Sequence, residues 1–211
     1  MSLITCTTSS KQGQLLLHRI SGITENFMED NARYLEEYGI VSGSRKQKYI
    51  SDLSRLIVNS RASHSDKNRI MDGIGILPTD KIKILLAMIT KQHNVGMKIE
   101  LSKNIYLIMI ENFDKIKETL FMREHVNIAK SYNSFIGLIT TTFNRGFAIQ
   151  KQIDRQILEG HKGLKNKKKG FNQVFQQYIL VYRGFMDMQI NSICSTVYLN
   201  DDVKNLIYSF M

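Results

Sequence analysis

The stretch LSKNIYLIMIENFDKIKETL, residues 101–120, decides the fold class. Its apolar side chains recur every three or four residues, which is the period of an α-helix. They are Leu101, Ile105, Met109, Phe113, Ile116 and Leu120. Residues 105–110 are apolar on every side of that helix, so we expect other helices to surround its middle. The stretch therefore predicts the central helix of an all-α bundle.

A second stretch with the same period, residues 175–197, predicts another long helix. Its apolar positions are Phe175, Ile179, Tyr182, Met186, Ile190, Ile193 and Val197. Weaker helical patterns occupy much of the remaining chain. The segment 139–143 contains enough β-branched residues to form an extended strand, although we interpret it as helical. Since the chain has a single proline, long helices are favoured. We predict an all-α bundle of about seven or eight helices, in which most neighbours are antiparallel.

The domain organisation follows from the residues that interrupt the helical pattern. Residues 1–12 are mostly small and polar, so we expect a loosely ordered N-terminus, followed by one helical domain over 13–211. Inside that domain, two glycines and the only proline fall close together. Because these residues disfavour helix interiors, a boundary between two lobes is predicted near 72–79.

Catalytic motifs with a fixed linear spacing do not occur in the sequence. The chain has no glycine-rich phosphate loop, no nucleophile elbow and no H-E-x-x-H zinc motif. Its five histidines are 29 to 46 residues apart, so no two share a helical face at metal-ligand spacing. We therefore predict no catalytic residue, no metal and no cofactor. An enzyme whose site is assembled only by the tertiary fold is the least favoured class.

Positive charge is concentrated in one short segment. The formal net charge of the chain is +10, and residues 151–170 hold seven basic and two acidic side chains. Five of these basic residues form what we call the lysine cluster, and they are Lys162, Lys165, Lys167, Lys168 and Lys169. Glycines on both sides of the cluster predict a solvated loop between helices. The lysine cluster is the candidate site for an anionic partner.

Several functions are compatible with this pattern. The leading interpretation is a non-catalytic helical protein-interaction module of the regulator, adaptor, inhibitor or toxin-neutralising type. Ten methionines and one-sided helices suit an adaptable contact surface, and the partner would be another protein or a second copy. The first alternative is nucleic-acid binding through 162–169, and an anionic lipid surface would suit the same lysines. The second alternative is a secreted helical effector that perturbs membranes.

The N-terminus and the cysteines bear on the compartment. The first ten residues lack the basic and apolar regions of a secretory signal. Cys6 and Cys194 are far apart, which indicates neither a disulfide framework nor a cysteine metal site. The purest apolar runs contain six residues, whereas a spanning helix needs about 18 or more. The sequence predicts a soluble cytoplasmic protein, with secretion by a signal-independent route as the alternative.

Overall fold

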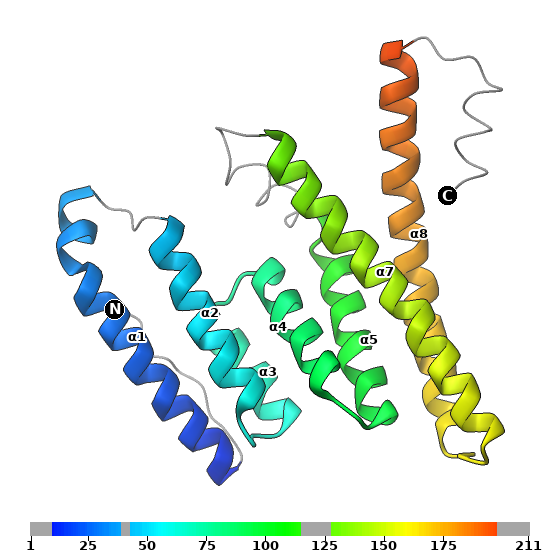
Figure 1. The fold of residues 1–211 in the computed structure, drawn as a ribbon, viewed down its shortest axis with the longest axis horizontal. Coiled ribbons are helices and arrows are strands. Elements are labelled where there is room, and N and C mark those ends of the chain that lie inside the picture. Colours follow the sequence, from blue (N-terminus) through cyan, green and yellow to red (C-terminus); the bar gives the residue numbers. More distant parts are fainter. Residues whose placement is uncertain (1–9, 39–42, 115–127, 198–211) are drawn as a thin grey trace. The chain divides into compact units, whose positions relative to one another are not determined.

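The computed structural model describes residues 10–38, 43–114 and 128–197, and within these ranges the chain forms seven α-helices and no strand (Figure 1). None of these described helices is long and apolar enough to span a membrane. The segment 139–143, whose β-branched residues also suited an extended chain, lies inside a long helix. The all-α bundle predicted from the sequence is confirmed.

Contacts between helices divide the chain into two compact units, Met1–Lys91 and Gln92–Met211. The boundary that the sequence predicted near 72–79 instead lies inside the first unit. The physical reason is that glycine and proline mark a break in a helix, and such a break serves equally well as a turn within a packed unit.

The residues near 72–79 form a tight turn between two helices of the first unit. Gly75 has a φ of 66°, a left-handed value that glycine adopts without strain. Pro78 is the first residue of the next helix. Proline is tolerated at this position because the backbone N–H that it lacks would have no acceptor within the helix. An ion pair between Lys81 and Asp72 joins the two sides of the turn.

The first unit contains α1 (Lys11–Tyr38), α2 (Gly43–Asn59), α3 (His64–Gly73) and α4 (Pro78–Lys91). The hydroxyl groups of Thr24 in α1 and Tyr49 in α2 are hydrogen-bonded at 2.9 Å. Further along α1, Asn31 accepts a hydrogen bond from Arg45, which is nearer the start of α2. The two helices are therefore antiparallel. Aliphatic side chains fill the interior, among them Leu16, Ile20, Leu53, Ile57, Ile70, Met71, Ile82 and Leu85.

α1 begins at Lys11, inside the N-terminal segment that the sequence predicted to be loosely ordered. The Ser10 hydroxyl accepts a hydrogen bond from the Gly13 N–H at 2.9 Å, which caps the helix. The same hydroxyl donates to the buried carboxylate of Asp66 in α3 at 2.5 Å. The start of α1 is therefore tied to α3. Residues 1–9 lie outside the described part of the chain.

The second unit contains α5 (Val95–Glu111), α7 (Ile128–Leu158) and α8 (Leu164–Val197). Tyr106 of α5 packs edge-on against Phe171 of α8, with ring centroids 6.0 Å apart. Phe113, later in α5, packs in the same way against Phe185, later in α8, at 5.6 Å. α5 and α8 are therefore parallel, an exception among the mostly antiparallel neighbours that the sequence predicted.

α7 runs antiparallel to both of its neighbours in the second unit. Near the start of α7, the Ile139 carbonyl accepts a hydrogen bond from the Tyr178 hydroxyl at 3.0 Å. Later in α7, the Gln150 side chain donates to Asn172, which lies earlier in α8, at 3.2 Å. Two hydrogen bonds between α5 and α7 follow the same antiparallel order.

An aromatic cluster fills the interior of the second unit. Its members are Tyr106, Phe171, Phe175 and Tyr178, each at most 1% exposed. Gly146 of α7 makes room for this cluster, because a Cβ at that position would lie 2.1 Å from a ring carbon of Phe175. Three apolar positions of the predicted central helix are buried as expected, namely Leu101, Ile105 and Met109. Its last part, 115–120, lies outside the described residues.

Candidate functional site

The structure corrects the sequence prediction for the lysine cluster. Lys162 lies in the turn between α7 and α8, but the other four lysines belong to the first turns of α8, which begins at Leu164. The prediction of a loop over the whole cluster was wrong. Lysine is a good helix former, and a single glycine inside a helix, here Gly170, costs only about 1 kcal/mol. Helical geometry therefore decides where these side chains point.

The turn that precedes the cluster is tightly closed. Gly160 has a φ of 99°, its N–H bonds the Ile157 carbonyl at 3.2 Å, and the His161 N–H bonds the Gln156 carbonyl at 3.0 Å. This pair of bonds is a Schellman motif, which occupies carbonyl groups at the end of α7. The turn therefore covers part of the negative end of α7 with groups of the chain itself.

The side chains of the lysine cluster point in three directions. Lys168 is ion-paired with Asp154 of α7. Lys167 lies toward α5, where its Nζ is 3.1 Å from the place that a Cβ on Gly96 would occupy. The other three lysines form what we call the lysine stripe: Lys162, Lys165 and Lys169. Their side chains are exposed, as is that of Lys167, and their ammonium groups have no ion-pair or hydrogen-bond partner among the described residues.

The lysine stripe runs from the turn before α8, where Lys162 lies, onto one face of that helix. Residues spaced by three and four share a helical face, and Lys165 and Lys169 are separated by roughly 6 Å along the helix axis. The same face continues with exposed Gln173, Gln176 and Gln177. The sequence has no acidic residue between Glu159 and Asp187. This side of α8 therefore presents ammonium and amide groups and no carboxylate until Asp187.

The parallel arrangement of α5 and α8 brings two helix N-termini to the same end of the second unit. Neither helix has an acidic residue in its first turn. Each N-terminus contributes roughly half a positive charge from aligned peptide dipoles, and the C-terminus of α7 contributes about half a negative charge. The peptide dipoles thus leave this end of the unit positive before any lysine is counted.

A hollow of about 470 Å³ lies between these two helix starts, and we call it the α5–α8 hollow. Its lining residues are His93, Asn94, Val95, Gly96, Gln156, His161, Gly163, Leu164 and Lys167. Two imidazoles, two side-chain amides and one ammonium line it, and no carboxylate does. Of the lysine cluster, only Lys167 reaches this hollow. Its chemistry suits an anion.

Aromatic side chains next to the lysine cluster do not belong to its surface. Exposed rings at Phe171 and Phe175 would serve as stacking platforms for unpaired bases. Both rings are instead buried in the aromatic cluster, at 0% exposure. The sequence had placed Phe175 among the apolar positions of the predicted helix 175–197. The lysine stripe therefore offers charge and hydrogen bonds, and neither of these rings is available for stacking.

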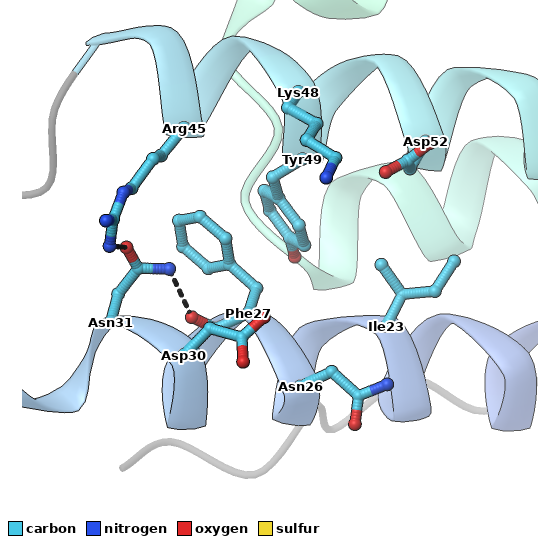
Figure 2. Close-up of a pocket in the computed structure, with 9 residues that line it drawn as sticks. All are labelled: Ile23, Asn26, Phe27, Asp30, Asn31, Arg45, Lys48, Tyr49 and Asp52. Atoms are coloured by element: carbon cyan, nitrogen blue, oxygen red, sulfur yellow. Dashed lines mark hydrogen bonds between the residues drawn. The ribbon is translucent and has the colours of Figure 1, made fainter.

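A second hollow, of about 500 Å³, lies between α1 and α2 in the first unit, and we call it the α1–α2 cleft (Figure 2). Its lining residues are Ile23, Asn26, Phe27, Asp30, Asn31, Arg45, Lys48, Tyr49 and Asp52. Phe27 and Tyr49 stack on one another with ring centroids 4.4 Å apart. Asp30 comes from α1 and Lys48 from α2. The α1–α2 cleft therefore combines an aromatic surface with charges of both signs.

Hydrogen bonds hold one end of the α1–α2 cleft in place (Figure 2). Arg45 donates to the Asn31 side-chain oxygen at 2.9 Å, and the Asn31 amide donates to the Phe27 carbonyl at 2.7 Å. Sequence reasoning missed this cleft. No local signal marks the cleft, since it arises only when α1 and α2 pair.

A titratable cluster surrounds the start of α3. The Ser63 hydroxyl accepts from the Asp66 N–H and donates to the Asp66 carboxylate, each at 3.0 Å, which closes the first turn of the helix. Burial, assisted by the positive charge of Lys67, lowers the pKa of His64 below the ordinary 6.5. Burial also lowers the pKa of Lys67. Because the hydrogen bonds of this cluster cap helix ends, we assign it a structural role.

Within the residues that the structure describes, no three histidine, cysteine, aspartate or glutamate side chains are grouped closely enough to hold a metal ion. Comparison of the chain with protein-family models, curated proteins and solved structures finds no match. Function is therefore inferred from the lysine stripe, the α5–α8 hollow and the α1–α2 cleft.

Proposed function

We propose that this protein is a helical interaction module whose partner is a nucleic acid, bound by the lysine stripe and the glutamines that follow it on α8. The observation that carries this proposal is a continuous surface, made by the turn before α8 and the first turns of α8, on which three exposed ammonium groups lack a partner among the described residues. No acidic residue lies between Glu159 and Asp187 to neutralise them. A polyanion supplies the missing negative charge.

The position of the stripe at the start of α8 strengthens this reasoning. A cation near a helix N-terminus is unfavourable by about 0.3 to 1 kcal/mol, so the free protein carries a repulsion that bound phosphates relieve. Duplex DNA presents one negative charge per roughly 1.7 Å of its axis, which is dense enough to engage every lysine of the stripe. Glutamine amides donate hydrogen bonds to phosphate oxygens or to base edges.

Fluorescence anisotropy of a labelled duplex over a salt series tests the proposal. We expect the Lys165→Gln/Lys169→Gln variant to bind more weakly than the parent. Its plot of log affinity against log salt should be shallower by about 1.8, because each phosphate contact contributes about 0.9 to the slope. The matched control is Lys11→Gln/Lys46→Gln, which removes two exposed lysines of the first unit and should keep the parent slope.

Two results would contradict the proposal. One is the absence of salt-sensitive binding to duplex or single strands at about 50 mM salt, where phosphate contacts are strong. The other is an equal loss of affinity in the two double variants, which would mean that total charge and not the stripe matters. Binding to poly-glutamate but to no nucleic acid would show that the partner of the lysine stripe is an acidic protein.

The α1–α2 cleft favours a second binding function, contact with a segment of another protein. Its stacked Phe27 and Tyr49 suit an apolar side chain, while Asp30 and Lys48 suit charges of opposite sign. A photo-crosslinking residue placed at Asn26, inside the cleft, should capture a protein that the same residue at exposed Gln47 does not. Identical captures at both positions would contradict this function.

A further inference from the structure

We infer that the α5–α8 hollow is a binding site for a phosphate monoester. This inference goes beyond the proposed function, because it concerns Lys167 and the start of α5 and uses no lysine of the stripe. Four observations carry it: the donors that α5 leaves free, the position of Lys167, the absence of acid from the lining, and the size of the hollow.

The first turn of α5 leaves two backbone donors available. The Asn94 side chain accepts from the Met97 N–H, and the Asn94 carbonyl accepts from the Lys98 N–H, both at 3.0 Å. The N–H groups of Val95 and Gly96 have no acceptor among the described residues. Both residues line the hollow. Such amides are the groups with which helix starts hold phosphate.

Lys167 places an ammonium beside these two amides. Its Nζ lies 3.1 Å from the point that a Cβ on Gly96 would occupy, and the Asn94 side-chain oxygen lies 3.2 Å from the same point. A Cβ at position 96 would therefore require the end of the lysine side chain to shift by a few tenths of an ångström. Lys167 has no ion-pair or hydrogen-bond partner among the described residues. Lysine is a common phosphate ligand in proteins.

The remaining lining favours an anion and excludes a cation. His93 and His161 stand among the lining residues, with the side-chain amides of Asn94 and Gln156. Imidazoles and amides donate hydrogen bonds to phosphate oxygens. The nearest acid on α7, Asp154, is already paired with Lys168. No charge in the lining therefore competes with a bound phosphate for Lys167.

The size of the hollow selects the class of ligand. Sites for small organic molecules are clefts of about 300 to 1,000 Å³, and the 470 Å³ of the α5–α8 hollow falls in that range. The volume exceeds what a phosphate group alone would fill. The ligand class is therefore a phosphate group carried on a small organic group or on the end of a nucleic-acid strand, and both sources present the same monoester chemistry.

Amide NMR spectra of the full chain, recorded during titration with inorganic phosphate and with ribose 5-phosphate, test the inference. The signals of Val95 and Gly96 should shift with saturation at millimolar ligand. Lys167→Gln should weaken binding about tenfold or more, because a charge-assisted hydrogen bond is lost. Lys169→Gln, which removes the same charge two residues further along α8 and outside the lining of the hollow, should keep the parent affinity.

Gly96→Ala provides a variant that retains every charge. The added Cβ moves the Lys167 ammonium by a few tenths of an ångström, so ribose 5-phosphate should bind more weakly than to the parent but more tightly than to Lys167→Gln. Unshifted Val95 and Gly96 signals would overturn the inference. An equal loss of affinity in Lys167→Gln and Lys169→Gln would overturn it as well.

Strands with a 5′-phosphate and with a 5′-hydroxyl distinguish the two sources of the monoester. A preference for the 5′-phosphate strand would assign the hollow to a strand end, and tighter binding of ribose 5-phosphate would assign it to a free metabolite. The stripe variant Lys165→Gln/Lys169→Gln separates this inference from the proposed function. It should lose duplex affinity and keep ribose 5-phosphate binding.

Discussion

In the first unit several of the buried polar groups are titratable side chains, whereas in the second unit two of the buried polar groups are tyrosine hydroxyls. Asp66 is 0% and Lys67 is 5% exposed, and His64 beside them is half-buried. In the second unit, Tyr106 and Tyr178 donate to carbonyls of α7, and burial raises the pKa of both hydroxyls far above the ordinary 10. The first interior therefore responds to pH near neutrality, and these tyrosines do not.

The surfaces of the two units differ in a second way. The α1–α2 cleft mixes acidic and basic side chains, while the lysine cluster gathers one sign of charge at one end of the second unit. Mixed charges cancel at short range, whereas charges of one sign repel one another until salt or an anion screens them. We therefore expect pH to change mainly the stability of the first unit, and salt to change mainly the stability of the second.

Gly146→Ala should have the largest effect, and it breaks the second unit alone. A Cβ there would lie 2.1 Å from a carbon of the Phe175 ring and 2.8 Å from the Tyr106 hydroxyl. Overpacking a filled core costs about 3 kcal/mol at the upper end of the usual range. Hydrogen exchange read by mass spectrometry should show faster exchange in α7 and α8, with α1 and α3 unchanged.

Gly184→Ala is the matched control for Gly146→Ala. Position 184 also lies inside a helix, but nothing lies within 4 Å of a Cβ placed there. Alanine should therefore stabilise α8 by about 0.5 to 1 kcal/mol, because glycine is a poor helix former. If both variants shifted the free energy of unfolding in the same direction, the close contact at Gly146 would not be the cause.

Asp66→Ala should have the next largest effect, and it breaks the first unit. The substitution leaves the hydroxyls of Ser10 and Ser63 without their carboxylate acceptor, at a cost of about 2 kcal/mol. Hydrogen exchange should quicken at the start of α1 and in α3. Asp66→Asn keeps one acceptor oxygen and should cost less. An equal loss in the two variants would show that the charge of Asp66, and not its hydrogen bonds, is what matters.

Protonation of His64 should have a smaller effect, which is a pH-dependent change in the stability of the first unit. Since the pKa of His64 is lowered in the folded protein, the unfolded chain binds a proton more readily. The free energy of unfolding of the first unit should therefore fall as the pH falls from about 7.5 to about 5.5. His64→Gln should flatten this dependence. A parent protein whose first unit is equally stable at both pH values would refute it.

Removing charge from the lysine stripe should have the smallest effect, which is a salt-dependent change in the stability of the second unit. At low salt, Lys165→Gln should raise the stability of the second unit by about 0.3 to 1 kcal/mol, because a cation is removed from the first turn of α8. The gain should vanish at about 1 M salt, where charges are screened beyond about 3 Å. Chemical denaturation by urea, which is uncharged, measures this gain in the free energy of unfolding. A gain that persisted at high salt would indicate helix propensity as the cause.

Sequence reasoning succeeded where a property belongs to one helix. The period of four identified Leu101, Ile105 and Met109 as a buried face, and all three are buried. It failed where a property depends on how an element is used. The glycines around the lysine cluster were interpreted as a loop, yet Gly170 lies inside α8. The break at 72–79 was interpreted as a boundary, yet it is a turn within the first unit.

The candidate sites divide in the same way. The sequence named all five lysines of the cluster, but it did not distinguish the exposed stripe from Lys167 or from Lys168, which pairs with Asp154. It also missed the α1–α2 cleft and the α5–α8 hollow. Both hollows are made by residues from separate helices, and no spacing along the chain records which helices become neighbours.

The sequence by itself determined that the chain is helical and that its positive charge is concentrated around 162–169, because periodicity and charge are local properties of the residues. Only the tertiary structure decided that α5 and α8 run parallel, which brings Lys167 to Gly96 and two helix N-termini to one end of a unit. That arrangement depends on which apolar faces pack together, and the matching of faces is a property of the folded chain.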